Sequence, residues 1–318
     1  MPFYMFADAA PSEAIQPHDL PGLAVACLLI HQNGVPIVNV PLVKQYKDWN
    51  PKTRDVAAVE LTRWLADQRE NCGLTIAGFS VARTQQAAAR YGLELIEELP
   101  DTRVEEHHGK FRLHFGDRHV SFSQAIALVY YNFPLNMGIL RAAKKINPEM
   151  RQILVLMDRF PAASSGNLQP GERSEMTPGM HFMRFLRGNT ATSIGIEKNN
   201  SEMGISYEMS TLDWWRFNAE DPEDKPGKKH PHFTLVDWYV ASSLAHEFPD
   251  EFVSSYPRQA KAEVVKNALC DLYDEFKKFD IWSIADDNTL DHIRANADGK
   301  HWTVPDDARD FIMNLAEA

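Results

Sequence analysis

Three aspartates of this chain lie in or at the end of apolar runs, where an unpaired charge is costly. FYMFAD ends at Asp8, ILVLMD ends at Asp158, and LVDWYV contains Asp237. If these carboxylates converge, they repel one another, and a divalent cation relieves the repulsion. Mg²⁺ prefers hard oxygen ligands, and such cations can hold the attacking and leaving oxygens of a phosphodiester. The pattern therefore predicts an Mg²⁺ or Mn²⁺ site for phosphodiester chemistry.

Each aspartate also has a structural interpretation that the residues leave open. Asp8 could form a turn or cap a helix after its strand. Asp158 could pair with the adjacent Arg159. Asp237 could face solvent, although aspartate is a poor helix former in the middle of a helix.

The expected elements place these residues at one edge of a sheet. Turn signals and apolar runs predict three consecutive strands, at FYMFAD, GLAVACLLI and VPIVNVPLV, followed by a helix over residues 50–71. LTIAGFSV then reads as a parallel strand. This order indicates an α/β fold, a ribonuclease-H-like mixed sheet flanked by helices. Asp8 and Asp158 should lie on adjacent strands, with the helix that contains Asp237 packed over that edge.

The rest of the chain divides into two predicted parts. Residues 1–248 are expected to form the ribonuclease-H-like α/β domain, and residues 249–318 a helical C-terminal extension. Within the first part, KFRLHFGDRHVSF alternates on both sides of Gly116-Asp117, which predicts a hairpin. The preceding EEHHGK is expected to be a solvated loop.

Three stretches resemble the family known as domain of unknown function 3800. FYMFADAA resembles the family's opening strand and DESG-like turn, ILVLMDR its later strand with an aspartate, and FTLVDWYVASSL its closing LQLADLVAG-like helix. Their order and spacing match over about residues 1–248. The resemblance implies a ribonuclease-H-like fold and a metal-dependent nuclease centre with Asp8, Asp158 and Asp237 as metal ligands.

The chain also departs from that family. Ala9 stands where the family has glutamate and Ala10 where it has serine, so one carboxylate beside Asp8 is missing. Its loss weakens the expectation of a two-metal mechanism. Glu60 on the first expected helix could supply a fourth acid, as ribonuclease-H-like enzymes do, or could simply face solvent.

Composition narrows the functional classes. The 318 residues include 33 Lys and Arg against 44 Asp and Glu, a net charge of −11, which is not typical of a protein that coats nucleic acid. Bound cations can offset local acid, so a nuclease remains open. The three scattered cysteines argue against a disulfide framework or a zinc site and favour a cytoplasmic protein. No apolar run approaches the roughly 20 residues of a membrane span.

Two functions follow from these observations. The first is a metal-dependent nuclease that acts on DNA or RNA through Asp8, Asp158 and Asp237. The alternative is a non-catalytic ribonuclease-H-like scaffold that binds a protein partner, as a subunit of a mobile-element or anti-phage defence assembly. Convergence of the three carboxylates is the property that separates them.

Overall fold

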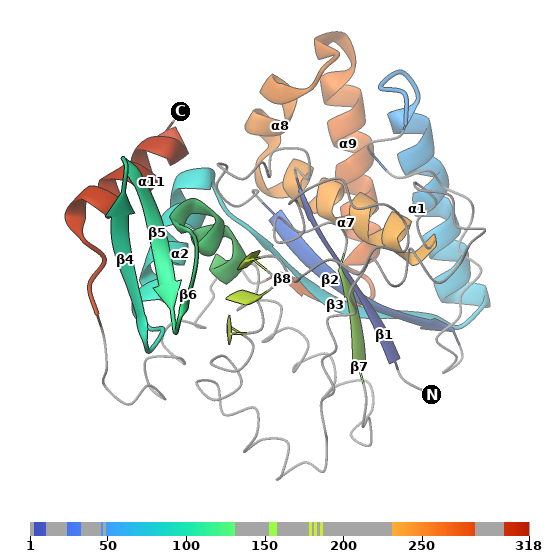
Figure 1. The fold of residues 1–318 in the computed structure, drawn as a ribbon. Helices are drawn as coiled ribbons and strands as arrows, with labels where there is room; N and C mark the ends of the chain where they lie inside the picture. The colour runs from blue at the N-terminus through green and yellow to red at the C-terminus, as the bar shows by residue number, and fades with distance from the viewer. Residues whose placement is uncertain are drawn as a thin grey trace, which may run out of the picture.

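The fold is a mixed α/β architecture, seen in a computed structural model (Figure 1). The structure describes residues 3–10, 24–32, 46, 49–130, 153–157, 178–179, 181–182, 185–186, 231–283 and 302–317. In this part of the chain, strands form a five-stranded sheet and a three-stranded sheet. No helix within these ranges combines the length and apolar character needed to cross a bilayer.

The larger sheet has the strand order β7-β1-β2-β3-β8. Its members are β1 (Phe3–Ala10), β2 (Ala24–Gln32), β3 (Leu74–Ala82), β7 (Ile153–Met157) and β8 (Asp280–Ser283). β2 is antiparallel to both β1 and β3, whereas β7 pairs parallel with β1 and β8 pairs parallel with β3. The sheet is therefore mixed, as the sequence predicts.

The place of β3 differs from the expectation. Instead of joining the sheet as a parallel strand after three antiparallel ones, β3 lies antiparallel beside β2, with Ala24 opposite Ala82 and Gln32 opposite Leu74. Both strands are nine residues long and apolar, so this pairing uses their full length. The expected third strand, at VPIVNVPLV, lies outside the described residues.

Helices cover one face of this sheet (Figure 1). Ala26, Leu28 and Ile30 alternate along β2, so they share a face. They belong to one buried cluster with Leu61 and Leu269 and with residues of the other helices on this side. These helices are α1 (Arg54–Asn71), α7 (Pro231–Glu247), α8 (Pro249–Ser255) and α9 (Gln259–Phe276).

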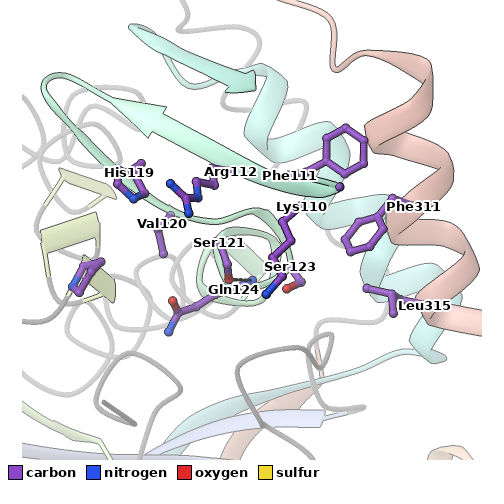
Figure 2. A pocket seen from close by; sticks show the side chains of 12 residues that line it. Lys110, Phe111, Arg112, His119, Val120, Ser121, Ser123, Gln124, Phe311 and Leu315 are labelled. Carbon is purple, nitrogen blue, oxygen red and sulfur yellow. Dashed lines mark hydrogen bonds between the residues drawn. The ribbon is translucent and has the colours of Figure 1, made fainter. Parts of the chain in front are cut away.

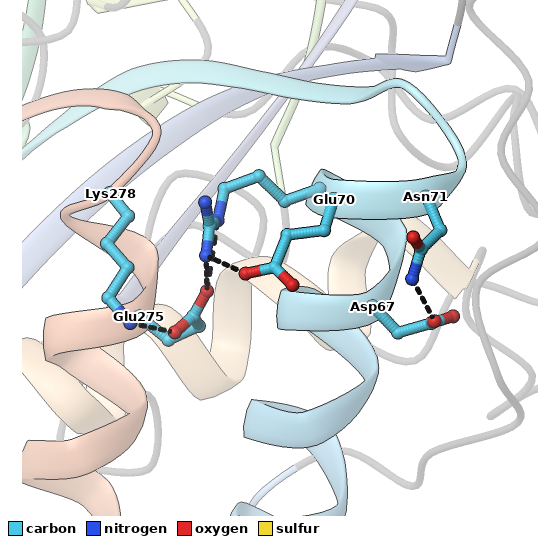
Figure 3. A network of polar contacts seen from close by, with 6 residues as sticks. Asp67, Glu70, Asn71, Glu275 and Lys278 are labelled. Atoms are coloured by element: carbon cyan, nitrogen blue, oxygen red, sulfur yellow. Dashed lines mark hydrogen bonds and ion pairs between the residues drawn. The ribbon is translucent and has the colours of Figure 1, made fainter.

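A buried carboxylate ties α9 to α1 (Figure 3). The side chain of Glu275 is 5% exposed and pairs with Arg69 of α1 at 3.1 Å and with Lys278 at 2.6 Å. A buried charge is tolerated when it is paired in this way, and removing one partner is strongly destabilising. The contact fixes part of the C-terminal region to the first helix of the chain.

The C-terminal region is not helical throughout. The expected helices α8 and α9 are present and pack in the same buried cluster as the larger sheet. Residues 280–283, in contrast, form strand β8. A further helix, α11 (Asp306–Glu317), lies against α2 (Gln85–Glu97), where Arg309 pairs with Glu97. The expectation of a purely helical appendage was therefore wrong for β8, because a strand of four residues gives too short a pattern to recognise.

The smaller sheet is a three-stranded meander of β4 (Thr102–His107), β5 (Lys110–Phe115) and β6 (Arg118–Ser121). The expected hairpin at Gly116-Asp117 joins β5 to β6. A second hairpin joins β4 to β5 through His108 and Gly109, whose φ values of 53° and 73° match the two positive values of a type I′ turn. The segment expected to be a loop is thus mostly strand β4 and its turn.

Candidate carboxylate site

The strand ends that should carry Asp8 and Asp158 lie side by side. β1 and β7 run parallel in register, from Phe3 opposite Ile153 to Ala7 opposite Met157. Asp8 is the next residue of β1. Asp158 follows Met157 in the sequence and lies outside the described residues. The adjacency of the two strands was expected and is present, whereas the convergence of their carboxylates stays a prediction.

The register places Asp8 in a row that crosses the sheet beneath α7. Asp8 is opposite Ala26 of β2, and Ala26 is opposite Ser80 of β3. Ser80 is buried, and its hydroxyl oxygen accepts a hydrogen bond from the hydroxyl of Tyr239 on α7 at 2.9 Å. Because α7 also contacts β1 and β2, the helix spans this row from β3 towards Asp8.

Asp237 is half-buried on α7 and is held by the backbone of a distant segment. One of its carboxylate oxygens, Oδ2, accepts a hydrogen bond from the backbone N–H of Tyr46 at 2.6 Å. Asp237 and Tyr239 are two positions apart, about 200° around a helix. Tyr239 faces β3, so Asp237 faces the Tyr46 segment instead.

The Tyr46 ring reinforces this contact. It meets the ring of the buried Trp238 edge to face at 5.2 Å between centroids, and the guanidinium of Arg54 lies 4.3 Å from its centre. Burial raises the pKa of the Tyr46 hydroxyl, an effect that Arg54 opposes. Asp237 therefore anchors a packed aromatic and cationic cluster, a role that its position in the sequence did not reveal.

Glu60 has the solvent-facing position that was its alternative interpretation. It is exposed on α1, next to the buried Leu61 and after the buried pair Ala57 and Ala58. Those buried neighbours mark the side of α1 that faces the core.

A divalent cation needs several oxygen ligands close together. In the described ranges, no group of three or more His, Cys, Asp or Glu side chains is placed to hold a metal ion. This covers Asp237 but not the complete set of expected ligands. The donor chemistry of Asp237 fits Mg²⁺ or Mn²⁺, because carboxylate oxygens are ligands that these hard cations prefer.

Sequence reasoning missed the buried hydroxyls between α7 and β3. Ser80 lies between Tyr239 and Ser243, whose hydroxyl is 3.4 Å away. Burial raises the pKa of Tyr239, so its phenol stays protonated as a donor. The signal that could have found this contact is the spacing of Tyr239 and Ser243, four residues apart and so on one helix face.

Comparison with protein-family models, with curated proteins and with solved structures finds no match for this chain.

Proposed function

We propose that this chain is a metal-dependent phosphodiesterase with a ribonuclease-H-like sheet, acting as a nuclease on DNA or RNA. The observation that supports it is the parallel, in-register pairing of β1 with β7, which brings the end of β7 beside Asp8. The packing of α7 on β1 and β2 adds the helix that carries Asp237. A sheet edge with two acidic strand ends and an acidic helix is an arrangement that suits a hard cation.

In this proposal, Asp8 and Asp158 hold the cation from the sheet and Asp237 from the helix. The Tyr46 N–H orients the Asp237 carboxylate before a cation arrives, which lowers the cost of ordering it. A bound Mg²⁺ or Mn²⁺ supplies an activated water and stabilises charge on the phosphate. With Ala9 beside Asp8, three carboxylates rather than four carry this role.

One observation favours the second candidate, a non-catalytic scaffold that binds a protein partner. The hydrogen bond from Tyr46 to Asp237 gives the carboxylate a structural purpose without any cation. In that case the net charge of −11 serves recognition of a partner, such as a subunit of a mobile-element or defence assembly.

Calorimetric titration with Mn²⁺ tests the nuclease proposal. The wild-type chain should bind Mn²⁺ in the millimolar range or more tightly, and Asp8→Asn should abolish binding and any cleavage of single-stranded or double-stranded DNA and RNA. The matched control is Asp67→Asn, because Asp67 is exposed on α1. Its carboxylate accepts hydrogen bonds from Asn71 and Gln68 of the same helix (Figure 3). Absence of Mn²⁺ binding by the wild type would reject the nuclease and favour the scaffold.

A further inference from the structure

An open pocket lies between the smaller sheet and helix α11, and none of its lining residues belongs to the carboxylate site (Figure 2). Its volume is about 610 Å³, within the range of about 300–1,000 Å³ that is usual for small-molecule sites. One wall is polar and basic, with Lys110, Arg112, His119 and Ser121 from β5 and β6. Phe311 and Leu315 from α11 line the pocket on the side of Phe111, which by alternation points to the other face of β5 from Lys110 and Arg112, so the pocket extends around the start of this strand.

The basic wall follows from the alternation of β5 and β6. Lys110 and Arg112 are two positions apart and so lie on one face of β5. Arg112 is opposite Ser121, and His114 is opposite His119, so this face continues onto β6. In a chain with a net charge of −11, this face carries more basic side chains than acidic ones, with Glu105 of β4 opposite Arg112, and such an excess of positive charge favours an anionic ligand.

Lys110 and Arg112 are the lysine and arginine side chains that line the pocket. Within the described ranges, the side chains of Lys110 and Arg112 take part in no ion pair, whereas Arg103 on the neighbouring strand is paired with Glu105 at 2.6 Å. Burial lowers the pKa of His119, and the nearby Arg112 adds to this effect, so His119 is neutral near pH 7 and the charge of this wall comes from Lys110 and Arg112. One carboxylate does lie on this face, since Glu105 of β4 is opposite Arg112, but Glu105 pairs with Arg103 and His114, which leaves Lys110 and Arg112 for an anion.

The start of a helix adds to this potential. Residues 122–130 are helical, and Ser121 caps them, its hydroxyl oxygen accepting a hydrogen bond from the backbone N–H of Gln124 at 3.3 Å. Ser121, Ser123 and Gln124 all line the pocket. The positive end of the helix dipole therefore points to the same space as Lys110, whose side chain extends towards Ser123 (Figure 2).

The apolar wall restricts the ligand further. Phe311 lies against Phe111, with 5.3 Å between ring centroids, and Leu315 continues this surface along α11. A simple inorganic anion gains nothing from contact with apolar side chains, whereas the flat base of a nucleotide stacks on aromatic ones.

We propose that this pocket binds a nucleotide, with its phosphate at Lys110 and Arg112 and its base against Phe311. The nucleotide is either a free mononucleotide or the 5′-phosphorylated end of a nucleic acid strand, since both present the same phosphate and base. This inference does not depend on the carboxylate site or on cation binding there.

Isothermal titration of the full chain with adenosine 5′-monophosphate tests the proposal. Binding should be measurable at low millimolar concentration or below, and adenosine without its phosphate should bind about tenfold or more weakly, because the charged hydrogen bonds are lost. Arg112→Gln should weaken nucleotide binding by about the same factor. Lys110→Gln should also weaken it, and because Lys110 is exposed, this second variant should fold normally. Phe311→Leu should weaken binding of the nucleotide more than that of inorganic phosphate.

Arg118→Gln is the matched control, because Arg118 is exposed on β6, does not line the pocket and pairs with Asp117 at 3.9 Å. Equal weakening by Arg118→Gln and Arg112→Gln would show general electrostatic attraction and overturn the proposal. So would a failure of the wild type to bind at several millimolar nucleotide. Tighter binding of a 5′-phosphorylated oligonucleotide than of the mononucleotide identifies a strand end as the ligand, and equal or weaker binding identifies a free nucleotide.

Discussion

The hydrogen bond between Asp237 and the Tyr46 backbone makes a quantitative prediction about Asp237 variants. The donor is a backbone N–H, the acceptor is a carboxylate oxygen 2.6 Å away, and the site is half-buried. Hydrogen bonds to charged groups contribute about 1.5–3 kcal/mol, against about 0.5–1.5 kcal/mol for neutral ones. Asp237→Asn keeps an acceptor and removes the charge, so it should lower the free energy of unfolding by about 1 kcal/mol.

Asp237→Ala removes the acceptor altogether. The loss of about 1.5–3 kcal/mol is offset by about 0.5 kcal/mol, because alanine favours the helix more than aspartate does. The net destabilisation should be about 1–2.5 kcal/mol. It should exceed that of Asp237→Asn, since the Tyr46 N–H then loses its partner.

Urea unfolding of the cation-free protein measures these differences, with stability read from the midpoint at a constant slope. Asp67→Asn, on the exposed side of α1, should change the free energy of unfolding by no more than about 0.5 kcal/mol. If Asp237→Ala unfolds at the same urea concentration as the wild type, or at a higher one, the anchoring role is refuted. Repulsion among carboxylates would then outweigh the bond to Tyr46.

Three further predictions concern the packing of the fold. A Cβ at Gly92 of α2 would lie 2.7 Å from Cγ2 of Ile126, so Gly92→Ala should lower the free energy of unfolding by about 1–3 kcal/mol. The double variant with Ile126→Ala should lose less stability than the sum of the two single variants, because Ile126→Ala removes the clash. A stabilised Gly92→Ala would contradict this contact. Both buried ring nitrogens of His31 lack a partner in the described structure, and burial lowers the pKa of His31 from 6.5, so the native imidazole is neutral. The stability that the neutral His31 contributes is therefore present above pH 6.5 and is lost as the pH falls through the lower native pKa. Between pH 7.5 and pH 5, the free energy of unfolding should decrease less for His31→Leu than for the wild type. Truncation after residue 258 tests the expected boundary at residue 248: because one hydrophobic cluster spans it, we expect no cooperative melting transition, and a folded fragment would instead establish a separate N-terminal domain.

Hydrophobic pattern was sufficient to find the elements that position the candidate site. The apolar run before Asp8 forms β1, the run before Asp158 forms β7, and the run around Asp237 forms α7. Local pattern reports burial and period, and these three segments are long or apolar enough to show both.

Pairing and long-range contacts could not be read in the same way. Nothing in the composition of β3 selects an antiparallel place beside β2 over a parallel one, because its period is the same in both. The contact between Asp237 and Tyr46 joins segments 191 residues apart and uses a backbone donor, which leaves no mark on residue type. The basic wall at Lys110 and Arg112 did carry a signal, the alternation of KFRLHF, but its meaning depends on α11 closing the pocket.

The position of β8 also affects how the chain is made. β3 ends at Ala82, but the strand that covers its outer edge starts at Asp280. At about 5–20 residues per second, a ribosome needs about 10–40 s to produce the intervening segment. During that interval the outer backbone N–H and C=O groups of β3 have no native partner and can pair with a strand of another nascent chain. Rapid translation of this segment, or a chaperone that shields β3, should therefore increase the yield of native protein.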